Sequence, residues 1–421
     1  MQSKERTYFC VDMKCFFASV ECVERGLNPF ETNLVVADAS RGNGGICLAI
    51  SPKLKAQGVK NRCRLFEIPK TINYITAKPQ MKKYIEYSAD IYGIYLKYVS
   101  SEDIHVYSID EAFLDVTDYL KCYKISAYDF AKLLIEEIAT IKGIPATVGI
   151  GTNLYLAKIA LDISAKKNAS HIAFLNEELY KKTLWKHQPI TDFWQIANGT
   201  AKRLAKYGIF DMKGIATADE RLLYRIFGIN AELLIDHANG KEPCLMKDIK
   251  AYKGKSHSVS TSQILFSDYA YDKALLVLME MTLNGCQELM KRGIIAKNVG
   301  IAVGYSKDVI PPTKATIKMV ERTNVYSVIK DYVKDLYEKT ANKTTPIRKL
   351  SITFFNVIDE SQEGYDMFCD YNKIQKEKAV EKTVLEIKDK FGKNAMLRCT
   401  DLTDGATATL RNKLIGGHNS E

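Results

Sequence analysis

The stretch Tyr107-Ser108-Ile109-Asp110-Glu111-Ala112-Phe113-Leu114-Asp115 places two adjacent carboxylates between two apolar segments. Residues 103–107 and 112–116 have the composition of β-strands, and Asp110 and Glu111 lie where the chain turns back between them. Adjacent carboxylates at such a junction lose hydration and repel each other, unless a divalent cation lies between them and a phosphate. An isolated Asp-Glu pair is more often a solvated turn, so the interpretation depends on the rest of the chain.

A third carboxylate supports the metal-site interpretation. Tyr8-Phe9-Cys10-Val11 predicts a short buried strand that ends at Asp12, and helical periodicity runs from Phe16 to Glu24. The free N–H groups at the start of a helix favour phosphates. Asp12 alone is typical of a helix N-cap, but together with Asp110 and Glu111 it predicts three acidic ligands for two Mg²⁺ ions. Such ions, typically ~4 Å apart, activate the attacking oxygen and stabilise the leaving oxygen in phosphoryl transfer.

Two motifs resemble those of a known family. Residues Val11 to Glu21 (VDMKCFFASVE) and Ser108 to Asp115 (SIDEAFLD) are similar to the catalytic motifs of Y-family translesion DNA polymerases, and the chain looks most like the bacterial UmuC-like branch. The resemblance implies an α+β multidomain fold with the right-hand arrangement of polymerases. It also implies a DNA-directed DNA polymerase of the lesion-bypass type in the DNA damage response, acting in the cytoplasm on primer-template DNA and deoxynucleoside triphosphates. No separate carboxylate constellation indicates a proofreading nuclease.

The resemblance implies the domains, and the order of the expected helices and strands places their boundaries. After residue 255 the pattern is β-α-β-β-α-β, the split βαβ order. A polar region follows residue 359, and residues 247–254 are the expected linker before the last domain. The expected domains are a palm (1–25 and 80–178), fingers (26–79), a helical thumb (179–247), a little finger (248–358) and a C-terminal tail (359–421).

The resemblance carries roles to residues near the carboxylates. Asp12, Asp110 and Glu111 are the expected metal ligands and catalytic residues, with the Met13 carbonyl as an additional ligand. The aromatic pair that follows Asp12 is expected beside the nucleotide, with its second ring as the steric gate that rejects ribonucleotides. These two rings are Phe16 and Phe17.

Basic residues are expected on the triphosphate. Lys55 lies where many relatives carry an Arg, whereas Pro52 replaces their Tyr. Lys166 lies near the family's triphosphate-binding lysine. Because the spacing from Lys158 is one residue longer than in some relatives, Lys167 is an alternative. Each of these lysines is equally consistent with a solvated helix face.

Two further segments resemble binding elements of the family. Residues 195–209 resemble a helix-hairpin-helix, which offers backbone N–H groups to DNA phosphates, although Ala197 stands where a hairpin Gly is common. Gly364-Tyr365-Asp366-Met367-Phe368 resembles a sliding-clamp peptide, with Gly364 in place of the usual Gln. A plain helical pair and an aromatic cluster packed on the last domain are the respective alternatives.

Composition agrees with a nucleic-acid partner. The chain of 421 residues carries a net charge of +10, and residues 253–355 hold 16 Lys and Arg against 9 Asp and Glu, a net +7. The ten cysteines form no C-x-x-C pair, which argues against a zinc ribbon, and no apolar run approaches membrane-spanning length. A non-catalytic adaptor of the same fold should have lost acidic ligands, and a nucleotide cyclase would not need the basic last domain.

Overall fold

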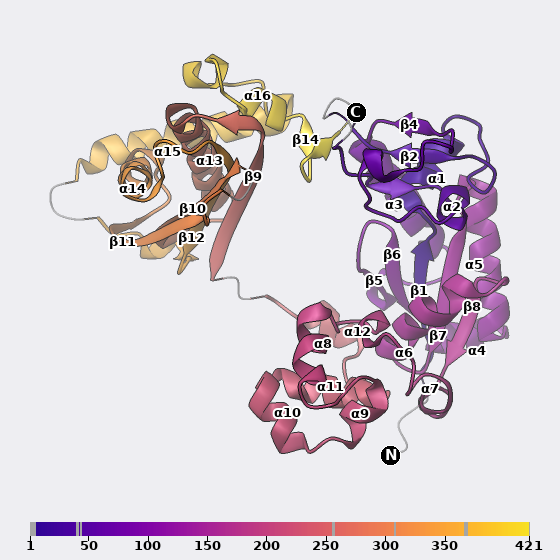
Figure 1. Ribbon diagram of the computed structural model, residues 1–421. Helices are drawn as coiled ribbons and strands as arrows, with labels where there is room; N and C mark the ends of the chain where they lie inside the picture. The colour runs from indigo at the N-terminus through magenta and orange to yellow at the C-terminus, as the bar shows by residue number, and fades with distance from the viewer. Residues whose placement is uncertain are drawn as a thin grey trace. The chain divides into compact units, whose positions relative to one another are not determined.

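The computed structural model describes residues 6–38, 42, 44–254, 257–306, 309–365 and 369–420. The chain divides between Tyr252 and Lys253 into two compact units, each described here by itself (Figure 1). Within the described ranges, every helix is too short or too polar to cross a bilayer.

A five-stranded sheet is the centre of the N-terminal unit. Its strand order is β5-β6-β1-β7-β8, so β1 is the middle strand. β1 pairs antiparallel with β6 and β7, while β7 and β8 are parallel. The sequence predicted the first four strands but not β8. The strands are β1 (Tyr8–Met13), β5 (Ile104–Val106), β6 (Glu111–Asp115), β7 (Ala146–Gly151) and β8 (Ile172–Leu175).

Helices cover both faces of this sheet, because side chains alternate along a strand. Phe9 and Val11 of β1 belong to the core that includes α3 and α5, whereas Tyr8 and Cys10 pack with α6 on the opposite face. By the same alternation, Asp12 lies on the α6 face. The helices are α1 (Phe16–Val23), α3 (Met81–Leu96), α4 (Thr117–Tyr123), α5 (Ala127–Lys142) and α6 (Leu154–Ile159).

The rest of the unit forms a small sheet and a group of short helices. The small sheet has the order β3-β2-β4, and residues around it form their own apolar cluster with α2. The short helices share a separate core with α6. These elements are β2 (Leu34–Val36), β3 (Ala49–Ile50), β4 (Ile75–Ala77), α2 (Pro52–Ala56), α7 (Glu177–Thr183), α8 (Asn198–Ala205), α9 (Met212–Thr217), α10 (Glu220–Phe227) and α11 (Asn230–Ala238).

The expected linker at 247–254 is wrong for most of its length. Residues Met246–Ala251 form helix α12, and Met246 is buried in one cluster with Tyr8 and Phe113. The Lys250 ammonium also donates to the Ser101 carbonyl at 2.8 Å. The apolar side of this short helix therefore holds it against the central sheet. The last domain begins after Tyr252 rather than at residue 248.

The C-terminal unit has the predicted β-α-β-β-α-β order. Its antiparallel sheet runs β11-β10-β12-β9, with α13 and α14 packed on one face. The small and hydroxyl side chains of the middle strands lie on the other, open face. The elements are β9 (Ser258–Tyr269), α13 (Tyr271–Lys291), β10 (Ile294–Tyr305), β11 (Thr313–Thr323), α14 (Tyr326–Thr340) and β12 (Ile347–Phe355).

The tail is folded onto this second unit. Glu381, on the longest tail helix, accepts a hydrogen bond from the Gln287 side chain of α13 at 2.9 Å. Thr407 donates its N–H and its hydroxyl to the buried carboxylate of Glu280, also on α13. The tail elements are β13 (Ile358–Asp359), α15 (Tyr371–Phe391), α16 (Ala408–Arg411), β14 (Leu414–Ile415) and β15 (His418–Asn419).

Candidate active site

The three predicted carboxylates meet at one end of β1 and β6. Asp12 pairs directly with Glu111 across the two strands, so their side chains share a face. Asp110 is the last residue of the connection between β5 and β6, and its carbonyl accepts from the Met13 N–H at 2.9 Å. Its side chain accepts from the Ser108 hydroxyl at 2.7 Å. The sheet register therefore brings together carboxylates that are about a hundred residues apart in sequence.

Lysines from one helical segment neutralise part of this charge. The Lys158 ammonium lies 2.7 Å from a Glu111 carboxylate oxygen and 3.0 Å from Asp162. The Lys166 ammonium lies 2.8 Å from Asp162 and 3.1 Å from Asp12. The alternating chain Glu111–Lys158–Asp162–Lys166–Asp12 carries a net charge of −1, and Asp110 adds to it. The site therefore retains excess negative charge.

Close packing of α6 on β7 fixes this segment. A Cβ added at Gly149 would lie 2.2 Å from the Ala157 carbonyl oxygen, and one at Gly151 would lie 2.1 Å from the Ala157 N–H nitrogen. Only glycine admits the helix backbone at this distance. As a result the buried Lys158 side chain is held beside Glu111.

A π-helical turn after Lys158 determines which of Lys166 and Lys167 lies beside Asp12. Residues Ala160–Ser164 form this turn between α6 and a 3₁₀ turn at Ala165–Lys167. A π-turn holds one residue more than an α-turn and often occurs at functional sites. Lys166 is therefore the lysine placed beside Asp12.

Burial changes the proton affinity of Asp12. The Asp12 side chain is 14% exposed, and its loss of hydration raises its pKa to about 6. Lys166 opposes this increase, while Asp110 and Glu111 add to it. Ionised Asp12 is therefore less stable here than in water, and a cation bound beside it would stabilise this form.

A cavity of about 620 Å³ opens beside Asp12 and Asp110. Its volume is within the range of pockets that hold a small ligand. Its lining combines these two carboxylates with four cationic side chains, which suits a polyanion that arrives with divalent cations. The cationic residues are Lys14, Lys55, Arg62 and Lys166.

The predicted aromatic pair also lines this cavity. Phe17 is partly exposed and stacks on the buried ring of Tyr84, with centroids 4.5 Å apart and an interplanar angle of 16°. Phe16 is 3% exposed and belongs to the core. The two rings enter α1 through Cys15, whose φ of 52° is in the left-handed region. This turn directs Phe17 towards the cavity.

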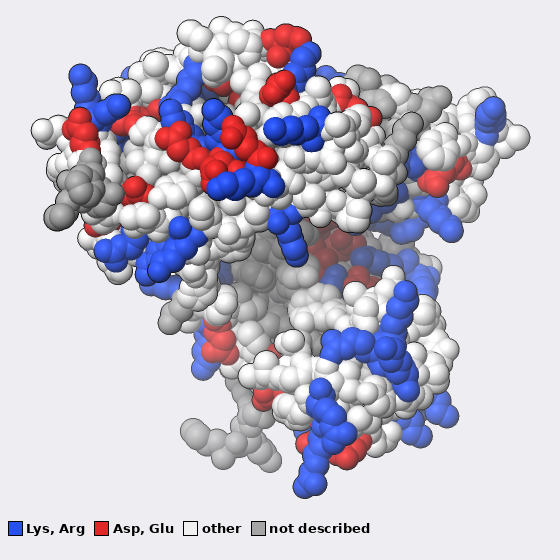
Figure 2. All heavy atoms as spheres, turned by 60° about the vertical axis from the view of Figure 1, so that its left-hand side comes forward, with Lys and Arg blue, Asp and Glu red and all other residues white. Residues whose placement is uncertain are grey.

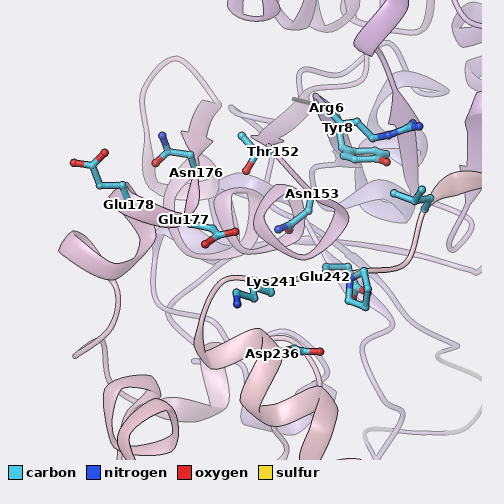
Figure 3. Close-up of a pocket in the computed structure, with 12 residues that line it drawn as sticks. Arg6, Tyr8, Thr152, Asn153, Asn176, Glu177, Glu178, Asp236, Lys241 and Glu242 are labelled. Carbon is cyan, nitrogen blue, oxygen red and sulfur yellow. The ribbon is translucent and has the colours of Figure 1, made fainter. Parts of the chain in front are cut away.

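The larger cavity of the N-terminal unit, about 850 Å³, has a different character. Figure 3 shows that Asn176 and Glu177, at the start of α7, face the same space as Asp236 of α11 and Lys241 just beyond it. Arg6, at its edge, is already paired with Asp115 at 2.7 Å. The acidic residues of the catalytic motifs do not line it, so we assign the chemistry to the smaller cavity.

The donor set fits Mg²⁺, although its side chains face lysines. In the ranges that the structure describes, no three Asp, Glu, His or Cys side chains are grouped closely enough to hold one ion. Oxygen ligands are what Mg²⁺ prefers, and the site offers three carboxylates and the adjacent Met13 carbonyl. The Lys166 contact supplies the positive charge that Asp12 requires. The residues fit the ion by chemistry and charge.

Some residues of the site were missed by sequence reasoning. Lys158 has a readable signal, because it is one lysine within the apolar run Leu154 to Ile163 and therefore needs a buried partner. Arg62 has a left-handed backbone, with φ of 61°, which its sequence does not reveal. Lys14 lies in the turn just after Asp12 and Met13, the expected metal ligands.

Comparisons with known proteins show the family of this chain. Residues 11–162 match the model of the impB/mucB/samB family, and residues 256–367 match that family's C-terminal domain. The chain is 32% identical over 427 residues to a putative UV-damage repair protein, UvrX, of Bacillus subtilis (strain 168), covering 100% of this chain and 99% of that protein. The chain belongs to this family. It is the Y-family of translesion DNA polymerases that the two motifs predicted.

Other similarities agree with this Y-family membership. The chain is 30% identical to DNA polymerase IV 2 of Bacillus subtilis (strain 168), covering 99% of each chain. Among solved structures, a Y-family DNA polymerase chimera (Dbh-Dpo4-Dbh) matches with a TM-score of 0.64 and 21% identity, covering 84% of this chain and 99% of that one. The right-hand, multidomain fold class predicted from sequence is confirmed.

Proposed function

We propose that this Y-family protein is a template-directed DNA polymerase of the lesion-bypass type. The observation that carries the proposal is the 620 Å³ cavity, in which the carboxylates Asp12 and Asp110 face four cationic side chains. Such a lining accommodates a nucleoside triphosphate with its divalent cations. Positioning and charge then supply most of the rate of phosphoryl transfer.

Asp12, Asp110, Glu111 and the Met13 carbonyl would hold two Mg²⁺ ions. When bound, the ions lower the pKa of the primer hydroxyl and neutralise the departing pyrophosphate. Lys158 keeps Glu111 in place through their 2.7 Å contact. The chain's own part is to orient these ligands and to keep the site negative.

Lys55, Lys166 and the N-terminus of α1 would bind the triphosphate. Lys55 and Lys166 both line the cavity, and the start of α1 faces it through Cys15 and Phe16. Lys166 is paired with Asp12 and can turn to a phosphate when another cation replaces it there. Lys166 lines the cavity and Lys167 does not, so we assign the role to Lys166.

Phe17 would be the steric gate. Stacking on Tyr84 restrains its ring, and a restrained ring beside the sugar leaves no room for a ribose 2′-hydroxyl. A ribonucleotide would have to shift, and misalignment of the reacting atoms is costly. Phe16 is buried in the core, and its ring packs against that of Phe17 with centroids 5.8 Å apart.

The open face of the C-terminal sheet would hold DNA. Cross-strand partners place Lys318 beside Asn298, Lys314 beside Ala302, and Lys349 beside Gly304 on this face. All three lysines are exposed, and the small residues between them leave space for a phosphate backbone. Contacts of this kind give grip without sequence choice.

The hairpin before α8 would add a second DNA contact in the thumb. Gln195 has a φ of 70°, the conformation that a hairpin glycine would supply, whereas Ala197 has an ordinary φ of −89° as the N-cap. The left-handed backbone of this turn is therefore at Gln195 and not at Ala197. On the face shown in Figure 2, Lys and Arg side chains gather on the lower part of the N-terminal unit, where Figure 1 places α8 to α11.

The sliding clamp remains a proposed partner. Asp366, Met367 and Phe368 lie outside the described residues. Tyr365 bonds with the Thr323 hydroxyl at 2.9 Å and packs edge-on against Tyr371. The tyrosine therefore anchors the base of the peptide, and residues 366–368 would supply the clamp contact.

A primer-extension assay with Mg²⁺ tests the proposal. The product sequence should follow the template, should include synthesis past a damaged base, and should show no excision of a mispaired primer end. A non-catalytic adaptor would bind the same DNA without extending it. A nucleotide cyclase would consume the triphosphate without any primer.

A further inference from the structure

A basic cavity of about 320 Å³ lies within the C-terminal unit, and none of the residues assigned to catalysis lines it. It is formed where helices α13 and α15 meet strand β9 and the segment at the end of α16. Its charged lining residues are Glu288, Lys291, Lys388, Asp389, Lys393 and Arg411.

The two carboxylates of this cavity are already neutralised. Asp389 accepts from the Lys291 ammonium at 2.5 Å, and Glu288 accepts from Arg292 Nε at 2.6 Å. The other cationic groups of the lining are therefore not balanced by them.

Lys388 and Arg411 have only neutral hydrogen-bond partners among the described residues. Lys388 donates to Gln287 Oε1 at 3.5 Å, and Arg411 Nη1 donates to Gln263 Oε1 at 3.1 Å. Among the residues that the structure describes, no carboxylate lies within ion-pair distance of the Lys388, Arg411 or Lys393 side chains. Burial lowers the pKa of both Lys388 and Arg411, and the charges of Glu381 and Asp401 near Lys388, and of Glu280 and Asp401 near Arg411, offset only part of this effect. A guanidinium with several free N–H donors matches the geometry of a phosphate.

The walls of the cavity are fixed by buried polar contacts. Glu381 accepts from the Gln287 amide at 2.9 Å and from Arg398 Nη2 at 2.6 Å, which orients the same Gln287 that faces Lys388. The chain before Arg411 is held because Thr407 donates to the buried Glu280. The cationic groups are thus placed before any ligand arrives.

The position of the cavity at a sheet edge indicates which phosphate it would receive. β9 is an edge strand, and its Thr261 lines the cavity, while Ser260 and Ser262 lie on the open face. Successive residues of a strand point to opposite faces. A nucleic-acid strand held on the open face therefore reaches the cavity by passing a single strand edge.

We propose that this cavity binds a backbone phosphate of DNA beyond the portion held by the open face. The inference rests on the proposed DNA-polymerase function. It also gives the tail a role, because α15 and Arg411 supply the cations. Free inorganic phosphate shares the same chemistry and is the other source that the experiment must distinguish.

The test compares the double variant Lys388→Gln, Arg411→Gln with the matched double variant Lys373→Gln, Lys376→Gln. The control pair lies on α15, is exposed, and removes the same charge outside the cavity. Fluorescence anisotropy measures the affinity of the full chain for a short primer-template and for one with a longer duplex, over a range of salt. Each phosphate contact contributes about 0.9 to the slope of log affinity against log salt.

The cavity variant should lose the additional affinity for the longer duplex and about one phosphate contact of salt slope, while the control keeps both. Arg411→Lys alone should retain the slope. Equal behaviour of the cavity and control variants would overturn the proposal. Protection of the wild type, but not the cavity variant, against thermal unfolding by inorganic phosphate, with unchanged DNA affinity, would overturn the assignment to DNA. Primer extension on the short substrate is measured in parallel, so that failure of the polymerase function would be seen separately.

Discussion

Replacing Asp12 by asparagine is expected to stabilise the N-terminal unit. In the folded chain the pKa of Asp12 is raised from 3.8 to about 6, so folding disfavours its ionised form. Stability from this group is therefore fully present below pH 3.8 and is lost as the pH rises through about 6. A difference of about two pKa units corresponds to about 3 kcal/mol, which the ionisation of Asp12 subtracts from the free energy of unfolding of the wild type at neutral pH. An asparagine at this position does not ionise, so the variant does not have this loss.

The assay is urea unfolding in the presence of EDTA, followed by tryptophan fluorescence. Both tryptophans, Trp185 and Trp194, lie in the N-terminal unit, so the signal reports that unit. Above about pH 7 the Asp12→Asn variant should exceed the wild type by about 3 kcal/mol in its free energy of unfolding, and the gain should shrink below about pH 6. Asp90→Asn, at an exposed ion pair with Lys142, should change it by less than about 1 kcal/mol.

A variant less stable than the wild type above about pH 7 would refute the reasoning. That result would mean that the contact between Asp12 and Lys166, 3.1 Å apart, outweighs the burial of the carboxylate. Added Mg²⁺ should stabilise the wild type more than the variant, because only the wild type retains an ionised ligand at position 12 beside Asp110 and Glu111.

The remaining predictions concern the nucleotide and the DNA. Phe17→Ala should admit ribonucleotides far more readily in single-nucleotide insertion kinetics while deoxynucleotide addition persists; unchanged sugar discrimination would place the gate elsewhere. Lys166→Gln should raise the KM for the incoming nucleotide at least tenfold, whereas Lys167→Gln should leave it nearly unchanged, and the reverse pattern would exclude the assignment made from the π-helical turn. Lys314→Gln with Lys318→Gln should weaken binding to all DNA sequences alike and reduce the salt slope by up to about 2; a sequence-dependent loss in binding titrations would contradict backbone contact.

The sequence was most informative where local pattern and chemistry agree. The carboxylates were found because each follows or precedes a short apolar strand, and the β-α-β-β-α-β order followed from period and length. The pairing of Asp12 with Glu111 depends on sheet register, which no local pattern specifies. The choice between Lys166 and Lys167 depends on a π-turn whose sequence, Ala160–Ser164, looks helical throughout.

Other features depended on tertiary contacts. The sequence prediction placed the linker too early because α12 is short and polar on one side. Only its burial against Tyr8 and Phe113 makes it part of the N-terminal unit. The left-handed backbone at Cys15 and Arg62 is imposed by surrounding structure, since neither residue type favours it. The basic cavity of the C-terminal unit joins side chains more than a hundred residues apart.

The most direct test of the central claim is single-nucleotide incorporation by Asp110→Ala and Glu111→Ala in the presence of Mg²⁺, with DNA affinity measured on the same samples. The Asp110 carboxylate lies at the end of a loop and is held by Ser108 alone among its described side-chain hydrogen bonds, so its removal should leave the fold intact. Both variants should lose incorporation by orders of magnitude while the Kd for primer-template stays within about twofold of the wild type, because phosphate contacts supply the grip. Near-normal incorporation by either variant would contradict the assignment of the active site.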